Sequence, residues 1–411
     1  MKIQFSARMP LYRLASATIG LVAFLGGTSA FANTGSFNEA CYLQRYPDVV
    51  TGWVNNGGKA IDHWLRHGQF EGRIPDCRGM AQPAPAPNPA PAPNPPPSSG
   101  SGAYTIIGGG PRPIEISVDP KRFAGSVTSL KWNGVEFVNI YDHGRQIQTA
   151  IQLDGFGECN NPTEAGSSHD VRSSTSTSKL LAHSKIAPNQ MANSIQMAYW
   201  SYRKLTGACP KGIDSRLTSP LSNTVLDKRI TIGAFGDNQI VSYALAINHG
   251  ARDLTQSVVY EFLTGYLNSE FKRFFFVTSQ NGALNEFLPS ELRDISGNGF
   301  PPGSYQAQSN RKKPFDPIIL SNPSGSHAMA AYVPPSQITS CGAGFGYAAF
   351  HFNLGGAGPK GAGTNKWNMA SYESVNSKCI VNGVRRYNVY IAVGTLAEVH
   401  SKLQTLIRNA R

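Results

Sequence analysis

The side chains best suited to chemistry gather in residues 141–146, which read YDHGRQ, and Glu164 and His169 follow a short way along the chain. Acid–base catalysis needs a proton donor and a proton acceptor, and a fixed guanidinium can hold a carboxylate. His143, Glu164 and His169 are therefore candidate acid–base groups. Arg145 is the candidate catalytic cation of the same cluster.

Asp142 and Gln146 flank these groups and are candidate substrate-binding residues. Residues 159–170 read CNNPTEAGSSHD, which is too polar and too rich in turn residues for a strand. They are predicted to form a long surface loop, and long ordered loops often carry function. The sequence leaves open a second interpretation, in which the loop is tied by Cys159 and its polar side chains satisfy its own backbone.

Further candidates lie later in the chain. His249 and Arg252 stand where an alternating strand gives way to a loop, although a lone histidine is often structural. Tyr266 is a candidate acid or base, and Trp367 is a candidate substrate-binding ring. Four secondary candidates are Glu261, His327, His351 and Lys366. Glu261 with Glu164 is the carboxylate pair that a hydrolase would need.

Several motifs of known chemistry are missing from the sequence. It contains no CxxC, HExxH, G-x-S-x-G or EF-hand pattern, which argues against redox dithiols, zinc peptidases, α/β-hydrolases and calcium loops. The glycine-rich residues 355–368 lack the spacing of a phosphate-binding loop and are predicted to form a flexible loop. We expect no metal and no cofactor.

The elements that position these residues follow an export signal. Residues 1–32 carry Lys2, Arg8 and Arg13, then an apolar run, then Ala-Phe-Ala, which is the pattern of a cleaved secretory signal peptide. The apolar run is too short to span a bilayer, and no later stretch is apolar enough. We expect a secreted or periplasmic protein with no membrane span.

The six cysteines fit an oxidising compartment, where thiols pair. Their order along the chain favours pairing between neighbours, although six cysteines allow 15 connectivities. The predicted disulfides are Cys41 with Cys77, Cys159 with Cys209, and Cys341 with Cys379.

A Pro/Ala repeat divides the mature chain. Residues 81–103 favour extended polyproline II and then loosen into Ser and Gly, so they are predicted to be a semi-rigid linker. Residues 33–80 are predicted to be a small helical module clipped by a disulfide. This module resembles a short helical repeat of bacterial secreted proteins, through CYLQRYPDVV and HWLRHGQFEGR. Its aromatic residues are either a sugar-stacking platform or, as we favour, its core.

Residues 104–411 are predicted to be mainly β. Apolar alternation recurs at residues 114–118, 147–153, 241–247 and 387–393, and Asn133-Gly134 is a strong hairpin signal. Helical periodicity returns only in a closing helix, at residues 396–406. We expect one large antiparallel sandwich or barrel.

The passage GSVTSLKWNGVEFVNIYDHGRQIQTA, residues 125–150, resembles the opening of the galactose-mutarotase-like supersandwich. This resemblance implies a β-supersandwich with a sugar cleft, in a superfamily that contains aldose epimerases, domains of glycoside hydrolases and polysaccharide lyases, and non-catalytic relatives. The family carries an Asn-His pair followed by an aromatic residue, whereas this chain reads Asn-His-Gly-Ala-Arg at residues 248–252, which argues against epimerase activity.

The net charge bears on the partner. Loss of the three basic residues of the leader would lower the formal charge from +12 to +9. This excess would suit an acidic polysaccharide, but with no dense basic run beyond residues 311–313 the interpretation as a matter of solubility is favoured, and no nucleic acid is expected. Two functions stay open for this monomer: a polysaccharide lyase or glycoside hydrolase, and a non-catalytic glycan-binding or cell-envelope surface protein.

Overall fold

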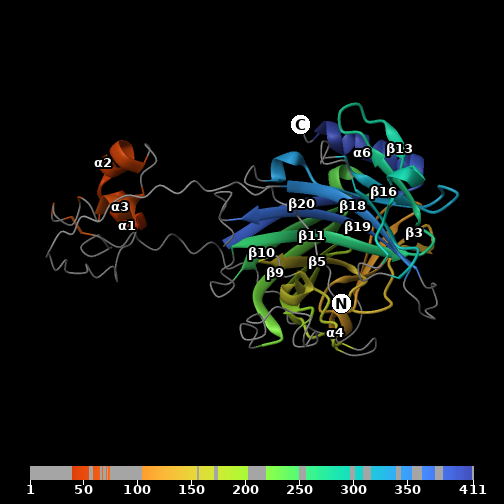
Figure 1. Cartoon of the computed structure of the whole chain (residues 1–411), viewed down its shortest axis with the longest axis horizontal. Helices are drawn as coiled ribbons and strands as arrows, with labels where there is room; N and C mark the ends of the chain where they lie inside the picture. Colours follow the sequence, from red (N-terminus) through yellow and green to blue (C-terminus); the bar gives the residue numbers. More distant parts are fainter. Residues whose placement is uncertain are drawn as a thin grey trace, which may run out of the picture. The chain divides into compact units, whose positions relative to one another are not determined.

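The computed structural model describes residues 39–54, 59–64, 67, 71, 73–74, 104–154, 157–170, 175–201, 219–249, 256–296, 301–308, 316–338, 344–353, 363–374 and 383–409. They fall in two compact units, a small one that contains the residues up to 74 and a large one that contains those from 104 onward (Figure 1). The expected signal peptide and the linker lie outside the described residues, so the domain boundaries stay predictions.

The large unit is an antiparallel β structure whose strands follow two hydrogen-bonded paths, and we call each path a layer. The first layer runs, in spatial order, through β1 (Tyr104–Ile107), β2 (Ile114–Val118), β3 (Val127–Trp132), β5 (Ile147–Leu153), β11 (Ser257–Asn268), β19 (Thr364–Ser374), β18 (Gly344–Phe352), β15 (Tyr305–Gln308) and β14 (Arg293–Asp294). The short β4 (Val135–Glu136) pairs with β3.

The second layer contains the remaining long strands. It runs through β7 (Lys179–Ala187), β8 (Gln190–Tyr199), β9 (Leu221–Ile232), β10 (Ile240–His249), β20 (Gly383–Gly394), β17 (Ala328–Tyr332), β16 (Ile318–Ser321), β12 (Arg273–Val277) and β13 (Leu284–Glu286). The short β6 (Pro162–Thr163) pairs with β5 and with β8 and so connects the two layers. The predicted large antiparallel β domain is confirmed.

Alternation along the strands places the core between the layers. In β10, Val241, Tyr243, Leu245 and Ile247 are buried at every second position, which is the period of a strand with one face in a core. Side chains of both layers belong to this one cluster. The predicted hairpin is also present, because Asn133 and Gly134 both have the positive φ that a type I′ turn requires.

The predicted closing helix is α6 (Leu396–Asn409), which packs on the second layer next to β16 (Figure 1). Thr395 and Glu398 form a capping box, in which each side chain accepts from the backbone N–H of the other. Val399, Leu403 and Leu406 are buried at helical spacing against the strands. This helix therefore covers one outer face of the sandwich.

The small unit has its own core. Its helices are α1 (Glu39–Arg45), α2 (Pro47–Val49), a π-helical turn (Val50–Val54) and α3 (Ala60–His63). Tyr42 is fully buried against Val49 and Ala60, and its hydroxyl lies 3.0 Å from His63 Nδ1. The core interpretation is thus confirmed for Tyr42.

Cys41 and Cys159 are disulfide-bonded. The other four cysteines lie outside the described residues, so no complete disulfide falls within the described part of the chain. The three pairings, and the disulfide clip of the small module, stay predictions. Within the same described ranges, no helix is both long enough and apolar enough to cross a membrane.

Candidate functional site

The outer face of the first layer carries polar and aromatic side chains in register. Tyr266 on β11 pairs directly with Lys366 on β19, and Lys366 pairs with Phe350 on β18. Each has a chain neighbour in the core, such as Leu267 beside Tyr266 and Trp367 beside Lys366. Because successive side chains of a strand point to opposite faces, these three point away from the core. We call the following set the polar face: Gln152, Glu261, Tyr266, Phe350, Lys366 and Asn368.

An ion pair lies at the centre of the polar face. Lys366 Nζ is 2.9 Å from Glu261 Oε2, and Gln152 Nε2 donates to Glu261 Oε1 at 3.2 Å. The side chains of Lys366 and Glu261 are only 9% and 14% exposed. Burial alone would lower the pKa of Lys366. The Glu261 carboxylate and Tyr266 raise this pKa by more than burial lowers it, so it lies above the usual range and the ammonium stays protonated.

The rings of Tyr266 and Phe350 both lie near the Lys366 ammonium. Lys366 Nζ lies 5.1 Å from the centre of the Tyr266 ring and 5.6 Å from that of Phe350. Burial raises the pKa of the Tyr266 phenol, and the charge of Lys366 opposes this rise without cancelling it. At neutral pH the phenol therefore keeps its proton and can donate a hydrogen bond.

Two buried acceptors beside this group have no partner among the described residues. They are Oδ1 of Asn368, whose residue is 8% exposed, and Oε1 of the fully buried Gln146. Buried polar atoms are normally satisfied by protein, water or ligand. The Asn368 acceptor lies on the polar face and is suited to receive a hydroxyl group of a bound molecule, whereas Gln146 is too deeply buried for this.

The loop of residues 141–146 borders the polar face. Tyr266 N–H donates to the carbonyl of Gln146 at 3.3 Å, which places the loop beside the β11 end of the face. Arg145 Nε lies 3.2 Å from Asp142 Oδ2, and the charge of Asp142 contributes to the raised pKa of Tyr266. The structure thus brings together four predicted site residues: Asp142, Arg145, Gln146 and Tyr266.

His143 has a different environment. It is 1% exposed, its Nδ1 lies 3.1 Å from the carbonyl oxygen of Ala165, and its ring lies 4.7 Å from that of Phe123. Its nearest carboxylate is Asp170, at 3.8 Å. These contacts hold the segment after β6 in place, and none of them is with the polar face.

Glu164 lies in the interior. Residues 159–167 are buried, so the predicted surface loop is wrong: this segment passes between the layers through β6. Glu164 forms an ion pair with Lys228, both side chains being 1% exposed, and it accepts from Thr149 N–H at 3.0 Å. Burial lowers the pKa of Lys228, and Glu164 only partly offsets this. The sequence interpretation was wrong because it took polar residues to be exposed, whereas Glu164 is buried with hydrogen-bonding partners inside the protein.

His249 ends β10 on its core-facing side. Its Nδ1 lies 3.2 Å from Thr224 Oγ1 and its Nε2 lies 3.0 Å from the Tyr260 hydroxyl. Burial, and to a lesser extent the charge of Arg385, lowers the pKa of His249 to about 4. The residue is therefore neutral at physiological pH and is held within the sandwich.

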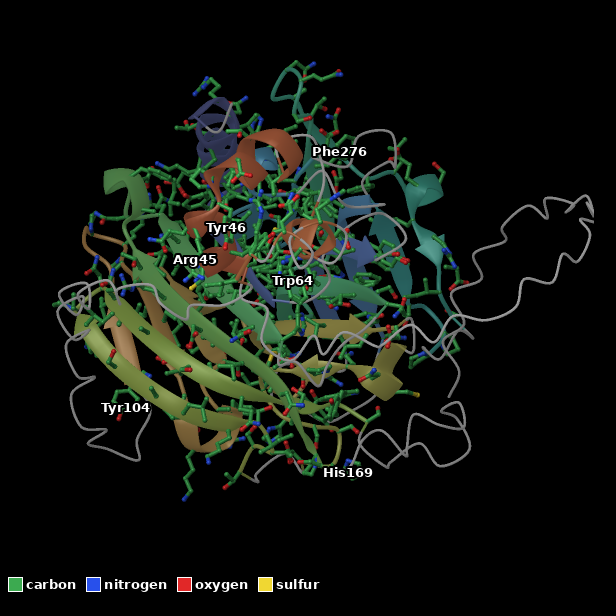
Figure 2. The ribbon with its side chains drawn as sticks, turned by 90° about the vertical axis from the view of Figure 1, so that its left-hand side faces the viewer. Arg45, Tyr46, Trp64, Tyr104, His169 and Phe276 are labelled. Carbon is green, nitrogen blue, oxygen red and sulfur yellow. The ribbon has the colours of Figure 1, made fainter. Side chains whose placement is uncertain are left out.

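The remaining predicted residues are dispersed. Trp367 is buried, donates from Nε1 to Met329 Sδ at 3.4 Å, and packs against Gly265. His169 is exposed, and Figure 2 shows it at the opposite edge of the large unit from Phe276. Arg252 lies outside the described residues.

Sequence reasoning treated Glu261 and Lys366 only as secondary candidates and missed Gln152, Phe350 and Asn368. A usable signal was present in β19, where Lys366 and Asn368 alternate with the apolar Trp367 and Met369. Within the described ranges, no three His, Cys, Asp or Glu residues cluster closely enough to hold a metal ion.

Comparison with known proteins gives similarity of structure alone. No protein-family model matches the chain, and no curated protein is similar to it in sequence. Among solved structures it is similar to the GH36 α-galactosidase AgaA from Geobacillus stearothermophilus, with 7% identity and a TM-score of 0.34, over 71% of this chain and 40% of that one. A β-arabinopyranosidase gives 11% identity and a TM-score of 0.30, over 70% and 40% of the two chains.

A putative aldose 1-epimerase from Klebsiella pneumoniae also matches, with 9% identity and a TM-score of 0.29, over 75% of this chain and 92% of that one. The chain spans about 40% of the length of the two glycosidases. Likenesses of this size carry no argument about activity.

Proposed function

We propose that this chain is an exported carbohydrate-active protein that binds a polysaccharide on the polar face. The observation that carries the proposal is the Glu261–Lys366 ion pair, which lies against Tyr266 and Phe350 on a face outside the core. Sugar-binding sites combine aromatic rings, which contact the apolar faces of the sugar, with charged and amide groups that bind its hydroxyls. Asn368 supplies an unpaired acceptor at the same face.

Binding is favoured over catalysis by the protonation states of this face. A base at neutral pH needs a pKa near 7. Lys366 and Tyr266 both have raised pKa values, so each keeps its proton. Glu164, the carboxylate that could have completed a hydrolase pair with Glu261, is buried against Lys228. The polar face therefore offers donors and fixed charges rather than a ready base.

A polysaccharide lyase is the second candidate, favoured by the contact between Lys366 and Tyr266. In this hypothesis Arg145 holds the uronate carboxylate of an acidic polysaccharide. Tyr266, deprotonated at alkaline pH, takes the proton from the carbon next to that carboxylate and then gives it to the leaving oxygen, and the electron pair of the broken C–H bond forms the new double bond. A phenol with a raised pKa is suited to donate this proton. It would act as the base only at alkaline pH, since Lys366 lowers its pKa less than burial raises it.

The test uses the mature protein and a panel of neutral and uronate-containing polysaccharides. Retention on a polysaccharide that is lost in Tyr266→Phe and kept in Tyr372→Phe supports binding on the polar face. Tyr372 is the matched control because it is exposed on β19, six residues beyond Lys366. Unsaturated products that absorb in the ultraviolet would establish the lyase instead. Retention that both variants keep would contradict a site on the polar face.

A further inference from the structure

A hollow of about 460 Å³ lies apart from the polar face, where the turn between β1 and β2 meets the turn between β9 and β10. Its lining includes Arg112, Trp132, Phe235, Asp237 and Asn238. This volume falls in the range of small-molecule sites, about 300–1,000 Å³. None of these residues belongs to the polar face.

Phe235, which lines this hollow, has a strained backbone conformation. It is 66% exposed and has a left-handed conformation, with φ 57° and ψ 24°. That conformation costs a bulky L-residue about 1–2 kcal/mol, while glycine adopts it freely, as Gly233 and Gly236 do on either side. A ring contact with Tyr390, at 5.0 Å between centroids, leaves most of the Phe235 side chain in solvent.

The charges around the hollow are already paired. Arg112 forms an ion pair with Glu398 and lies over the Trp132 ring, 4.7 Å from its centre. Asp237 forms an ion pair with Lys402. Because each charged lining residue has its opposite charge at hand, the hollow has no unbalanced charge with which to hold a uronate or another ion.

Two polar groups at the hollow stay without partners in the described part of the chain. The exposed Asn238 side chain forms no hydrogen bond there. The indole N–H of Trp132 is buried and also unpartnered, in a residue that is 1% exposed. The exposed Phe235 ring offers an apolar surface at the hollow, and the exposed Asn238 amide beside it offers hydrogen bonds; the Trp132 indole is too deeply buried to do so.

We infer that this hollow is a second carbohydrate-contact site that takes a neutral pyranose unit. The exposed face of Phe235 packs against the apolar face of the sugar ring, and Asn238 binds its hydroxyls. The paired charges select a neutral sugar over an acidic one. Two separated contacts with one polysaccharide would raise the overall affinity by making the second contact intramolecular.

The test uses the full mature chain with a neutral galactan and a neutral glucan, both built of pyranose units, and with polygalacturonate. Phe235→Trp places a reporter at the hollow and keeps the ring. Its fluorescence is expected to shift to shorter wavelength with at least one neutral polysaccharide and not with polygalacturonate. Phe235→Gly should bind that polysaccharide at least fivefold more weakly, with an unfolding temperature equal to or above that of the original protein.

Leu288→Ala is the matched control, since Leu288 is a 60% exposed apolar side chain elsewhere on the large unit. It should leave binding unchanged. Equal affinities of Phe235→Gly and Leu288→Ala, or no fluorescence shift with any neutral polysaccharide, would overturn the inference. The result is separable from the fate of the polar face, because Tyr266→Phe should leave the fluorescence shift of the Phe235→Trp reporter intact.

Discussion

The buried pair of Glu164 and Lys228 gives the sharpest stability prediction. Both side chains are 1% exposed, and Glu164 also accepts a hydrogen bond from Thr149 N–H at 3.0 Å. Lys228→Met removes the only cation that the structure pairs with Glu164 among the described residues and leaves the carboxyl group in the core. Breaking one side of a buried pair costs about 3–5 kcal/mol, a large share of the total stability of about 5–15 kcal/mol.

The double variant Lys228→Met with Glu164→Gln removes both charges and keeps an acceptor for Thr149. Replacing both partners of a buried pair is often close to neutral. We expect the double variant to recover to within about 1 kcal/mol of the original protein, so the two substitutions should be strongly non-additive.

Urea unfolding at pH 7, followed by tryptophan fluorescence, measures these free energies. The expected order of stability is the original protein and the double variant together, with Lys228→Met well below both. A loss under about 1 kcal/mol for Lys228→Met would refute the reasoning, because it would mean that the carboxylate is hydrated rather than buried. If Lys228→Met fails to fold, recovery of folding in the double variant would still support a large cost of leaving Glu164 unpaired, and failure of both variants would contradict it.

Three further predictions concern single residues. Gly265→Ala should cost about 1–3 kcal/mol in urea unfolding, because the new Cβ would lie 2.4 Å from the Trp367 ring, whereas Gly346→Ala, with nothing within 4 Å, should change stability little. The pKa of His249 is about 4 in the folded protein, below its ordinary value of 6.5, so the unfolded chain binds the proton more tightly. As pH falls from about 6.5 to 4, the protein should lose up to about 3 kcal/mol of stability. His249→Gln should remove this part of the loss, which a comparison of urea midpoints across the same pH range would show. His143→Ala should lower the free energy of unfolding by about 2–3 kcal/mol, since it removes a buried ring and its contact with a backbone carbonyl, and an unchanged urea midpoint would contradict this.

Most of the fold could be predicted from the periodicity of the strands. Residues 241–247 and 387–393 alternate in sequence, and β10 and β20 pair along these stretches with the apolar side chains in the core. The Asn133-Gly134 turn and α6 were also predictable, because each depends on local residue chemistry. Local signals suffice where the structure is decided by nearest neighbours.

The candidate site was harder to predict because it depends on register between distant strands. Lys366 and Glu261 are 105 residues apart in the chain and meet only because β11 pairs with β19. The prediction for Glu164 failed in the opposite direction. The polar sequence around Glu164 suggested a surface loop, but Lys228, 64 residues away, forms an ion pair with the Glu164 carboxylate in the interior. Polarity alone does not distinguish an exposed group from a buried and satisfied one.

The most direct test of the account replaces the charged pair of the polar face with neutral groups of similar shape. Glu261→Gln with Lys366→Met removes both charges, so neither substitution leaves its former partner as an unpaired ion. Isothermal titration of this variant with the polysaccharide that the original protein retains should show at least a tenfold weaker affinity, with the urea midpoint nearly unchanged. Full affinity in the variant would contradict the assignment of the polar face as the site.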